Sequence, residues 1–159
     1  MNILVGVADM KVSNDPESIL VTHSLGSCIG VAVYDQRVHA GGLLHFMLPD
    51  SSIDPGKAQE KPCMFADTGI PLLFKSVYKL GGKKQRMKVI VVGGSQVNDR
   101  GEFFNIGKRN YMVVRKIFWK NNVIIDYQHV GGNGNRTIKM AIKDGHTWLK
   151  VSGENMIEI

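Results

Sequence analysis

Two residues of this sequence, Cys28 and His45, have side chains that together could carry out nucleophilic chemistry. Cys28 lies in the stretch THSLGSCIGVAVYD, where a tight Leu-Gly-Ser turn delivers a thiol to the start of an apolar run. A free thiol is mostly protonated at neutral pH, and a neighbouring imidazole can accept its proton. The pair would then become a thiolate facing an imidazolium, which together supply the nucleophile and the base of a cysteine hydrolase.

The expected pairing of two strands brings these side chains together. Two apolar runs separated by a short polar turn indicate a hairpin, and they span residues 28–35 and 38–48. If Tyr34 pairs with His39, Cys28 directly faces His45, with Cβ atoms about 5 Å apart. A slip of one residue would separate the two side chains onto opposite faces of the ribbon. The face that they share carries small residues and is expected to leave open space: Gly30, Ala32 and Gly41.

Three further residues near the thiol could complete the site. Gly26 and Ser27 allow a tight turn, so that the N–H of Cys28 and a neighbouring N–H could bind an oxyanion. Thr22 could orient the imidazole of His45 through a hydrogen bond. Taken singly, each residue also has an ordinary interpretation, because most free cysteines are small buried hydrophobic residues. The predicted site therefore depends on the joint arrangement.

The elements that position these residues indicate an α+β fold. Apolar helical spacing predicts one helix from Asp67 or Thr68 to Gly81-Gly82 and a second over 106–121 after Asn105. Polar stretches at 49–62 and 98–104 are expected to be loops. Strands are expected at 2–8, 19–22, 28–35, 38–48, 87–95, 123–130, 136–143 and 146–152. The simplest architecture is a layered sandwich of packed β-sheets flanked by two main helices.

The composition is that of one globular domain over residues 1–159. The chain is 43% hydrophobic and 21% charged. No apolar run reaches the roughly 18 residues that span a bilayer, and the start of the chain lacks a secretion-signal pattern, so we expect a cytoplasmic protein without membrane insertion. A disulfide between Cys28 and Cys63 is not expected in a reducing compartment. Cys63 follows a proline outside any reactive motif.

The formal charge of +6 indicates attraction to acidic partners. Basic residues cluster at 83–88 and 108–120, but no nucleic-acid-binding motif accompanies them, so a solvated basic face is the preferred interpretation. Nucleic acid is therefore not an expected partner. Trp119 and Trp148 are expected to anchor a helix and a strand to the core.

Three other features have mainly structural interpretations. Gly93-Gly94-Ser95 resembles an anion-binding turn, but its glycine pattern is too short for a nucleotide fingerprint. The motif NIGKRN (residues 105–110) is expected to shape a loop and a helix start, with a supporting role in the site as the alternative. His23 could perturb the site or bind a metal together with Cys28 and His45, and the metal is the less favoured reading.

Six segments resemble, in order and spacing, the CheD chemoreceptor glutamine deamidases of bacterial and archaeal chemotaxis. They are THSLGSCIGVAVYD, GGLLHFMLPDS, FADTGIPLL, VVGGS, NIGKRN and VGGNGNR. The resemblance implies hydrolysis of glutamine side chains on methyl-accepting chemotaxis receptors through a cysteine thioester, giving glutamate and ammonia. It assigns Cys28 as the nucleophile, His45 as the base and Thr22 as the third residue. It also implies a fold similar to the catalytic domain of cytotoxic necrotizing factor toxins. The reaction so implied requires no metal or organic cofactor.

The resemblance leaves alternatives for function open. Glutamate methyl esters would pass through the same thioester, so ester hydrolysis is a plausible side reaction. A CheC-type phosphatase that occupies and inhibits the enzyme is an implied partner. A different class of function is an adaptor that binds receptors or CheC with little turnover. A thiol hydrolase or redox protein acting on an unrelated substrate is the third reading.

Overall fold

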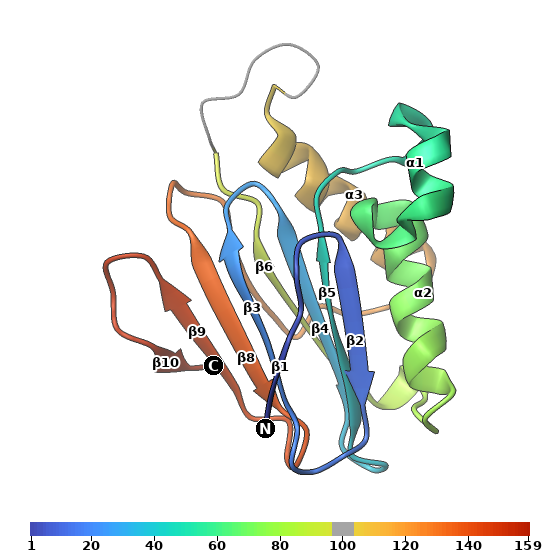
Figure 1. Cartoon of the computed structure of the whole chain (residues 1–159), viewed down its shortest axis with the longest axis vertical. Coiled ribbons are helices and arrows are strands. Elements are labelled where there is room, and N and C mark those ends of the chain that lie inside the picture. Colours follow the sequence, from blue (N-terminus) through green and yellow to red (C-terminus); the bar gives the residue numbers. More distant parts are fainter. Residues whose placement is uncertain (97–103) are drawn as a thin grey trace.

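In the computed structural model, two five-stranded sheets pack face to face, and helices cover the outer face of one of them (Figure 1). The structure describes residues 1–96 and 104–159. Sheet A has the order β1 (Asn2–Leu4), β3 (Ile19–Leu25), β8 (Arg136–Ala141), β9 (Thr147–Val151) and β10 (Ile157–Glu158). Sheet B has the order β2 (Asp9–Ser13), β5 (Ala40–Phe46), β4 (Ile29–Asp35), β6 (Met87–Gly93) and β7 (Tyr127–Val130). The helices are α1 (Pro55–Glu60), α2 (Ala66–Tyr78) and α3 (Ile106–Lys120), with short 3-10 turns at Ser51–Ile53, Pro62–Met64 and Lys84–Arg86. This arrangement confirms the predicted α+β sandwich of packed sheets.

The central strands of sheet B are buried on both faces. Side chains alternate along a strand, so Ile29, Val31 and Val33 of β4 pack toward the helices. Ala32 and Tyr34 of the same strand pack toward sheet A. Every residue of β4 and β5 is consequently buried. A strand covered on both faces reads as a continuous apolar run, which is why these two strands are conspicuous in the sequence.

The β4–β5 hairpin forms as predicted, but its register differs by two residues. Tyr34 pairs with Gly41 instead of His39, because the turn is longer than expected and His39 belongs to it with a φ of +50°. His45 therefore faces Gly30, and the predicted direct opposition of Cys28 and His45 is wrong. A shift of two residues keeps every side chain on its predicted face.

The expectation of open space on that face is also wrong, since sheet A covers it. A Cβ atom added at Gly41 would lie 2.9 Å from the Met140 side chain. One added at Gly30 would lie 2.9 Å from the Leu25 side chain. The small residues therefore allow close packing of the two sheets.

The helices differ from the prediction at their ends and in one insertion. α2 begins after Phe65, because Asp67 accepts hydrogen bonds from the backbone and hydroxyl of Ser51 and does not cap the helix. The predicted loop over 49–62 contains α1, whose first turn is capped by the Asp54 carboxylate. The second predicted helix is confirmed as α3. The loop predicted over 98–104 lies almost entirely outside the described residues.

Trp119 does not anchor α3 to the core, because 79% of this residue is exposed. Phe118 occupies the buried position beside it and packs edge-on against Phe74 of α2.

Strands β2 and β10 were not expected from the sequence. Among the described residues, no helix has both the length and the apolar character needed to cross a bilayer.

Candidate active site

Thr22 and His45 meet between the two sheets. Thr22 belongs to β3 of sheet A and His45 to β5 of sheet B. The Thr22 hydroxyl oxygen lies 2.8 Å from Nδ1 of His45, and both side chains are fully buried. The predicted neighbours are therefore in contact, although they are twenty-three residues apart in the chain.

The hydroxyl of Thr22 determines which nitrogen of His45 carries the proton. Its single proton is donated to the backbone oxygen of Val5 at 2.7 Å, since a carbonyl can only accept. The same oxygen must then accept from His45, so Nδ1 carries the hydrogen and Nε2 carries the lone pair. This is the tautomer in which the imidazole offers a free base at Nε2.

The Nε2 atom of His45 is buried and has no hydrogen-bond partner among the described residues. Burial lowers the pKa of His45 from 6.5 to about 4, because the charged imidazolium is poorly solvated there. His45 is consequently neutral at neutral pH. An unpartnered buried acceptor is uncommon in folded proteins, and here it is available to take a proton from an incoming or neighbouring group.

Cys28 lies one residue before β4 and is half-buried. It packs against the apolar cluster between the two sheets, on the side of sheet B that His45 also faces. Burial raises the pKa of the Cys28 thiol, and the backbone N–H of the same residue opposes this with a smaller lowering effect. In the free protein, the thiol and the imidazole are therefore both neutral.

The backbone around the thiol is held by three hydrogen bonds from outside. We call residues 26–28 the thiol loop and residues 93–95 the glycine turn. The Gly26 carbonyl oxygen accepts from the N–H of Ser95 at 2.8 Å, and the Cys28 carbonyl oxygen accepts from the N–H of Gly94 at 2.9 Å. The Ser27 carbonyl oxygen accepts from the side-chain amide of Asn110 at 3.0 Å. In a trans peptide the C=O and the following N–H point in opposite directions, and the structure contains no cis peptide among the described residues. The N–H of Ser27 therefore points away from Ser95, and the N–H of Cys28 points away from Asn110.

Asn110 is fully buried in the second turn of α3 and connects the two halves of the site. Its side-chain amide donates to Ser27 and also to the backbone oxygen of Met47 at 2.8 Å. Ser27 precedes Cys28, and Met47 follows His45 by two residues. One amide thus ties the backbone that carries the thiol to the backbone that carries the imidazole.

The glycine turn fits closely against the thiol loop. Gly93 has a φ of +115°, and a Cβ atom at this position would lie 2.2 Å from the Cys28 carbonyl oxygen. Gly107 at the start of α3 is equally restricted, since its Cβ would lie 2.3 Å from the Ser95 carbonyl oxygen. The N–H groups of Gly94 and Ser95 bind loop carbonyls, so the turn supports the thiol loop and does not offer these groups to an anion.

Arg136 secures the glycine turn to sheet A. This residue of β8 is only 4% exposed. Its guanidinium donates to the Gly93 carbonyl at 3.1 Å, the Ser95 hydroxyl at 2.8 Å and the Gly131 carbonyl at 2.6 Å. Burial lowers the pKa of Arg136, and these neutral acceptors replace the lost solvent.

Sequence reasoning gave Asn110 a supporting role only as the alternative interpretation of NIGKRN, and it did not identify Arg136 as part of the site. The partners Ser27 of Asn110 and Ser95 of Arg136 lie 83 and 41 residues away in the chain, and only the folded structure shows those pairings. One signal was present for Asn110. It lies on the apolar stripe of the predicted helix with Ile106, Val114 and Phe118, where a polar residue needs an explanation.

The remaining candidates, His23 and Cys63, have other surroundings. His23 is exposed, and its Nδ1 lies 3.3 Å from the hydroxyl of Thr137. Cys63 is buried in the cluster under the helices, on the other face of sheet B. Within residues 1–96 and 104–159, no group of three or more His, Cys, Asp or Glu could hold a metal ion.

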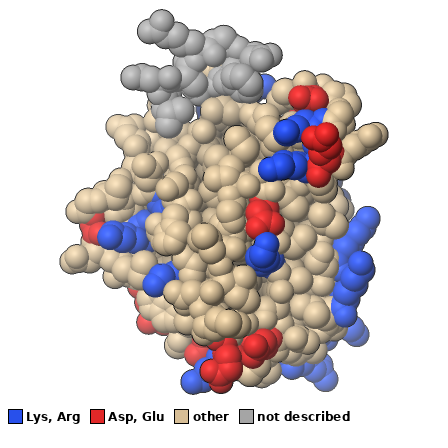
Figure 2. All heavy atoms as spheres, viewed as in Figure 1, with Lys and Arg blue, Asp and Glu red and all other residues tan. Residues whose placement is uncertain are grey.

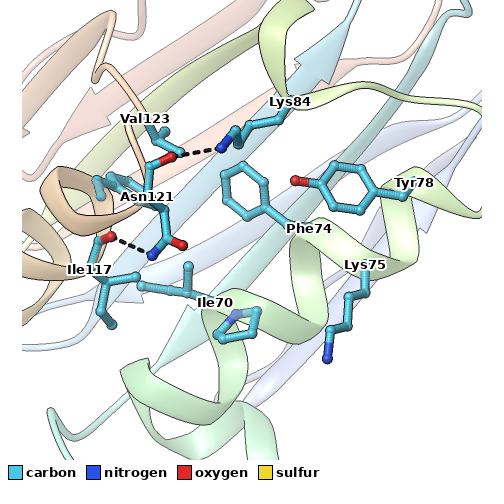
Figure 3. A pocket seen from close by; sticks show the side chains of 10 residues that line it. Ile70, Phe74, Lys75, Tyr78, Lys84, Ile117, Asn121 and Val123 are labelled. Atoms are coloured by element: carbon cyan, nitrogen blue, oxygen red, sulfur yellow. Dashed lines mark hydrogen bonds between the residues drawn. The ribbon is translucent and has the colours of Figure 1, made fainter.

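A hollow between α2 and the end of α3 lies away from the site. Figure 3 shows Phe74 and Tyr78 of α2 near Ile117 of α3 and Asn121, the residue after α3. The hollow between them has a volume of about 200 Å³. Its apolar lining belongs to the cluster on the helix side of sheet B, whereas His45 points to the other side. This hollow is therefore not the entrance to the thiol.

Comparisons with known proteins identify the family of this chain. A family described as "CheD chemotactic sensory transduction" matches residues 47–151. The chain is 52% identical over 158 residues, 99% of both chains, to "Probable chemoreceptor glutamine deamidase CheD 1" of Syntrophus aciditrophicus. It is 46% identical to "Probable chemoreceptor glutamine deamidase CheD" of Solibacter usitatus, over 96% of this chain and 90% of the relative. It is 40% identical to "Probable chemoreceptor glutamine deamidase CheD 2" of Anaeromyxobacter dehalogenans, over 97% and 96%. The chain belongs to the CheD family.

Proposed function

We propose that this protein deamidates glutamine side chains of chemoreceptors, with Cys28 as nucleophile, His45 as base and Thr22 as the residue that orients His45. The observation that carries the proposal is the buried Thr22–His45 contact, which leaves an unpartnered lone pair at Nε2 on the side of sheet B where Cys28 lies. The names of the relatives, chemoreceptor glutamine deamidases, support the choice of substrate.

The first half of the reaction releases ammonia. As the Cys28 sulfur bonds to the glutamine amide carbon, its proton passes to Nε2 of His45. The carbonyl oxygen becomes an oxyanion that the N–H groups of Cys28 and Ser27 bind. The imidazolium then gives its proton to the amide nitrogen, the carbon–nitrogen bond breaks, and ammonia leaves a thioester on Cys28.

The second half restores the enzyme. His45 takes a proton from water, the resulting hydroxide attacks the thioester carbon, and the oxyanion forms again in the same position. The carbon–sulfur bond breaks, and the sulfur recovers its proton. The net change is glutamine plus water to glutamate plus ammonia, and these steps use no metal or organic cofactor.

The pKa directions set the order of events in the first step. Burial raises the pKa of the Cys28 thiol and lowers that of His45, so an ion pair is disfavoured before substrate arrives. We propose that proton transfer accompanies the attack of sulfur on the amide. Thr22 assists by holding Nδ1–H, because an imidazolium forming at Nε2 then has a hydrogen-bond acceptor at its other nitrogen.

The test is incubation with a cytoplasmic receptor fragment that carries glutamines, followed by mass spectrometry for amide-to-acid conversion. Wild type should convert selected glutamines, and Cys28→Ala and His45→Gln should not. Cys63→Ala is the matched control, since it removes the other thiol on the far side of sheet B. Absence of conversion by folded wild-type protein would reject the deamidase. Normal receptor signalling by Cys28→Ala would favour the adaptor instead.

Two further points belong to the same proposal. A glutamate methyl ester presents a carbonyl to Cys28 as the amide does, so the same thioester leads to methanol release. A CheC-type phosphatase stays a predicted partner. The cytoplasmic location and the likeness to the cytotoxic necrotizing factor fold also stay predictions.

A further inference from the structure

Two neighbouring hollows lie along α3, starting next to the thiol loop. The first, of about 250 Å³, is lined by Gly94, whose N–H binds the Cys28 carbonyl, and by Tyr111. The second, of about 340 Å³, is lined by Tyr111, Arg115 and Trp119. Tyr111 is shared by both, and its hydroxyl donates to Gln128 of β7, the edge strand of sheet B. We call this surface between α3 and β7 the α3 track.

The side chains of the α3 track are of the kind that dominate protein interfaces. Tyr111, Arg115 and Trp119 follow one another at intervals of four residues and so share one face of the helix. Trp119 is 79% exposed, and Ile124 in the segment after the helix is 78% exposed. Trp, Tyr and Arg are the residues most enriched among those that carry binding energy. A tryptophan left in water at this position is better explained by a partner than by packing within the chain.

Two segments of the helical layer have a one-sided charge. Residues 68–96 and 104–125, which include most of α2 and all of α3, contain eleven Lys or Arg and no Asp or Glu. The other described residues contain more acidic than basic ones. Figure 2 shows the basic side chains along the margin occupied by α2, in contrast to the mixed charges over α1. The complementary occupant is acidic.

We propose that the α3 track docks an acidic segment of the protein substrate, with apolar side chains in its hollows, and thereby presents the neighbouring glutamine to Cys28. This inference rests on the proposed function. A second copy of this chain fits the track poorly, because two basic faces would repel each other. A lipid surface also fits poorly, because the hollows are concave and suit individual side chains.

The test is steady-state deamidation of the receptor fragment by wild type, Trp119→Ala and Arg115→Glu. Each variant should raise KM by roughly tenfold or more while kcat at saturating fragment stays within twofold. Added salt should raise the wild-type KM and have a smaller effect on Arg115→Glu. Lys150→Glu and Leu4→Ala, which make matched changes at exposed positions of sheet A, should retain the wild-type KM.

A binding measurement separates failure of this inference from failure of the proposed function. Cys28→Ala should bind the fragment, and addition of Trp119→Ala should weaken that binding by a similar factor. If wild type deamidates the fragment and both α3 variants keep the wild-type KM, the docking role is wrong and the deamidase stands. If Trp119→Ala instead dissolves a dimer, or abolishes binding to anionic vesicles without changing KM, the track serves another occupant and the inference is overturned. If the fragment is bound through the track and never deamidated, the proposed function fails while the docking surface stands.

Discussion

Nδ1 of His45 lies 2.8 Å from the hydroxyl oxygen of Thr22, which itself donates to Val5. This hydroxyl has only one proton, which it donates to Val5, so it must accept a hydrogen bond from His45. Thr22 therefore selects the tautomer of a histidine on the opposite sheet without needing a negative charge. A carboxylate in its place would raise the pKa of the imidazole, whereas a hydroxyl leaves it low.

Replacement of Thr22 tests this role. Thr22→Val keeps the shape and removes the hydroxyl, so Nδ1–H loses its acceptor and the lone pair is no longer fixed at Nε2. We expect kcat for deamidation to fall by roughly ten- to hundredfold with little change in KM, and stability to fall by about 1–3 kcal/mol. Thr22→Ser should retain most of the activity. Equal kcat values for the Val and Ser variants would contradict the orienting role.

The low pKa of His45 predicts a specific dependence of stability on pH. Between about pH 4 and 6.5 the unfolded chain binds a proton at His45 that the folded protein does not. Stability from this group is thus complete above pH 6.5 and declines as the pH falls to 4, by about 3 kcal/mol in total. Urea unfolding at pH 7 and pH 4 measures the loss.

The comparison with His45→Gln isolates this contribution. The carboxyl groups of Asp9, Asp35 and Asp50 have lowered pKa values and also destabilise the protein in acid. They are unchanged in His45→Gln, so the variant should lose about 3 kcal/mol less than wild type between the two pH values. Identical losses would show that His45 titrates normally in the folded state.

The raised pKa of Cys28 predicts slow alkylation at neutral pH. The rate of reaction with iodoacetamide, followed by mass spectrometry at Cys28, should keep rising beyond pH 9. Cys63→Ala removes interference from the second thiol. A rate that levels off near pH 6 or 7 would instead indicate a preformed thiolate–imidazolium pair.

Asn110 should affect catalysis more than its distance along the chain from Cys28 suggests. Asn110→Asp keeps the size of the side chain but replaces the donor to Ser27 and Met47 with an acceptor. We expect kcat to fall at least tenfold, because the thiol loop and the end of β5 both lose the hydrogen bond from the Asn110 amide. Asn121→Asp, at the exposed end of α3, is the matched control and should behave as wild type. Full activity of Asn110→Asp in a folded protein would argue against this tie.

The part of the site that depends on local pattern could be predicted from the sequence. The alternation of side chains placed Cys28 and His45 on one face of the hairpin, and a register error of two residues preserved that placement. The exact pairing was not predictable, because it depends on the length of the turn at His39. The contact of Thr22 with His45 joins two sheets. The residue types suggested this hydrogen bond and the resemblance to a family assigned Thr22 to the site, but no local pattern could show that the two sheets bring the side chains together.

Features set by packing between distant elements were missed or misjudged. Asn110 and Arg136 act through partners on other elements, and residue type alone gives no sign of those partners. Gly41 was expected to border open space, but Met140 from the other sheet fills it. Trp119 was assigned to the core because tryptophan is usually buried, whereas Phe118 takes that position. α1 could have been predicted, since Asp54 followed by Pro55 is a common start of a helix.

Because Thr22 and His45 come from different sheets, neither sheet alone holds both side chains of the proposed site. A partly unfolded form that keeps only sheet B intact would hold the imidazole without the Thr22 hydroxyl, and heat inactivation should therefore coincide with separation of the two sheets. No single break in the chain can separate these two sheets, because strands of sheet A both precede and follow the strands of sheet B.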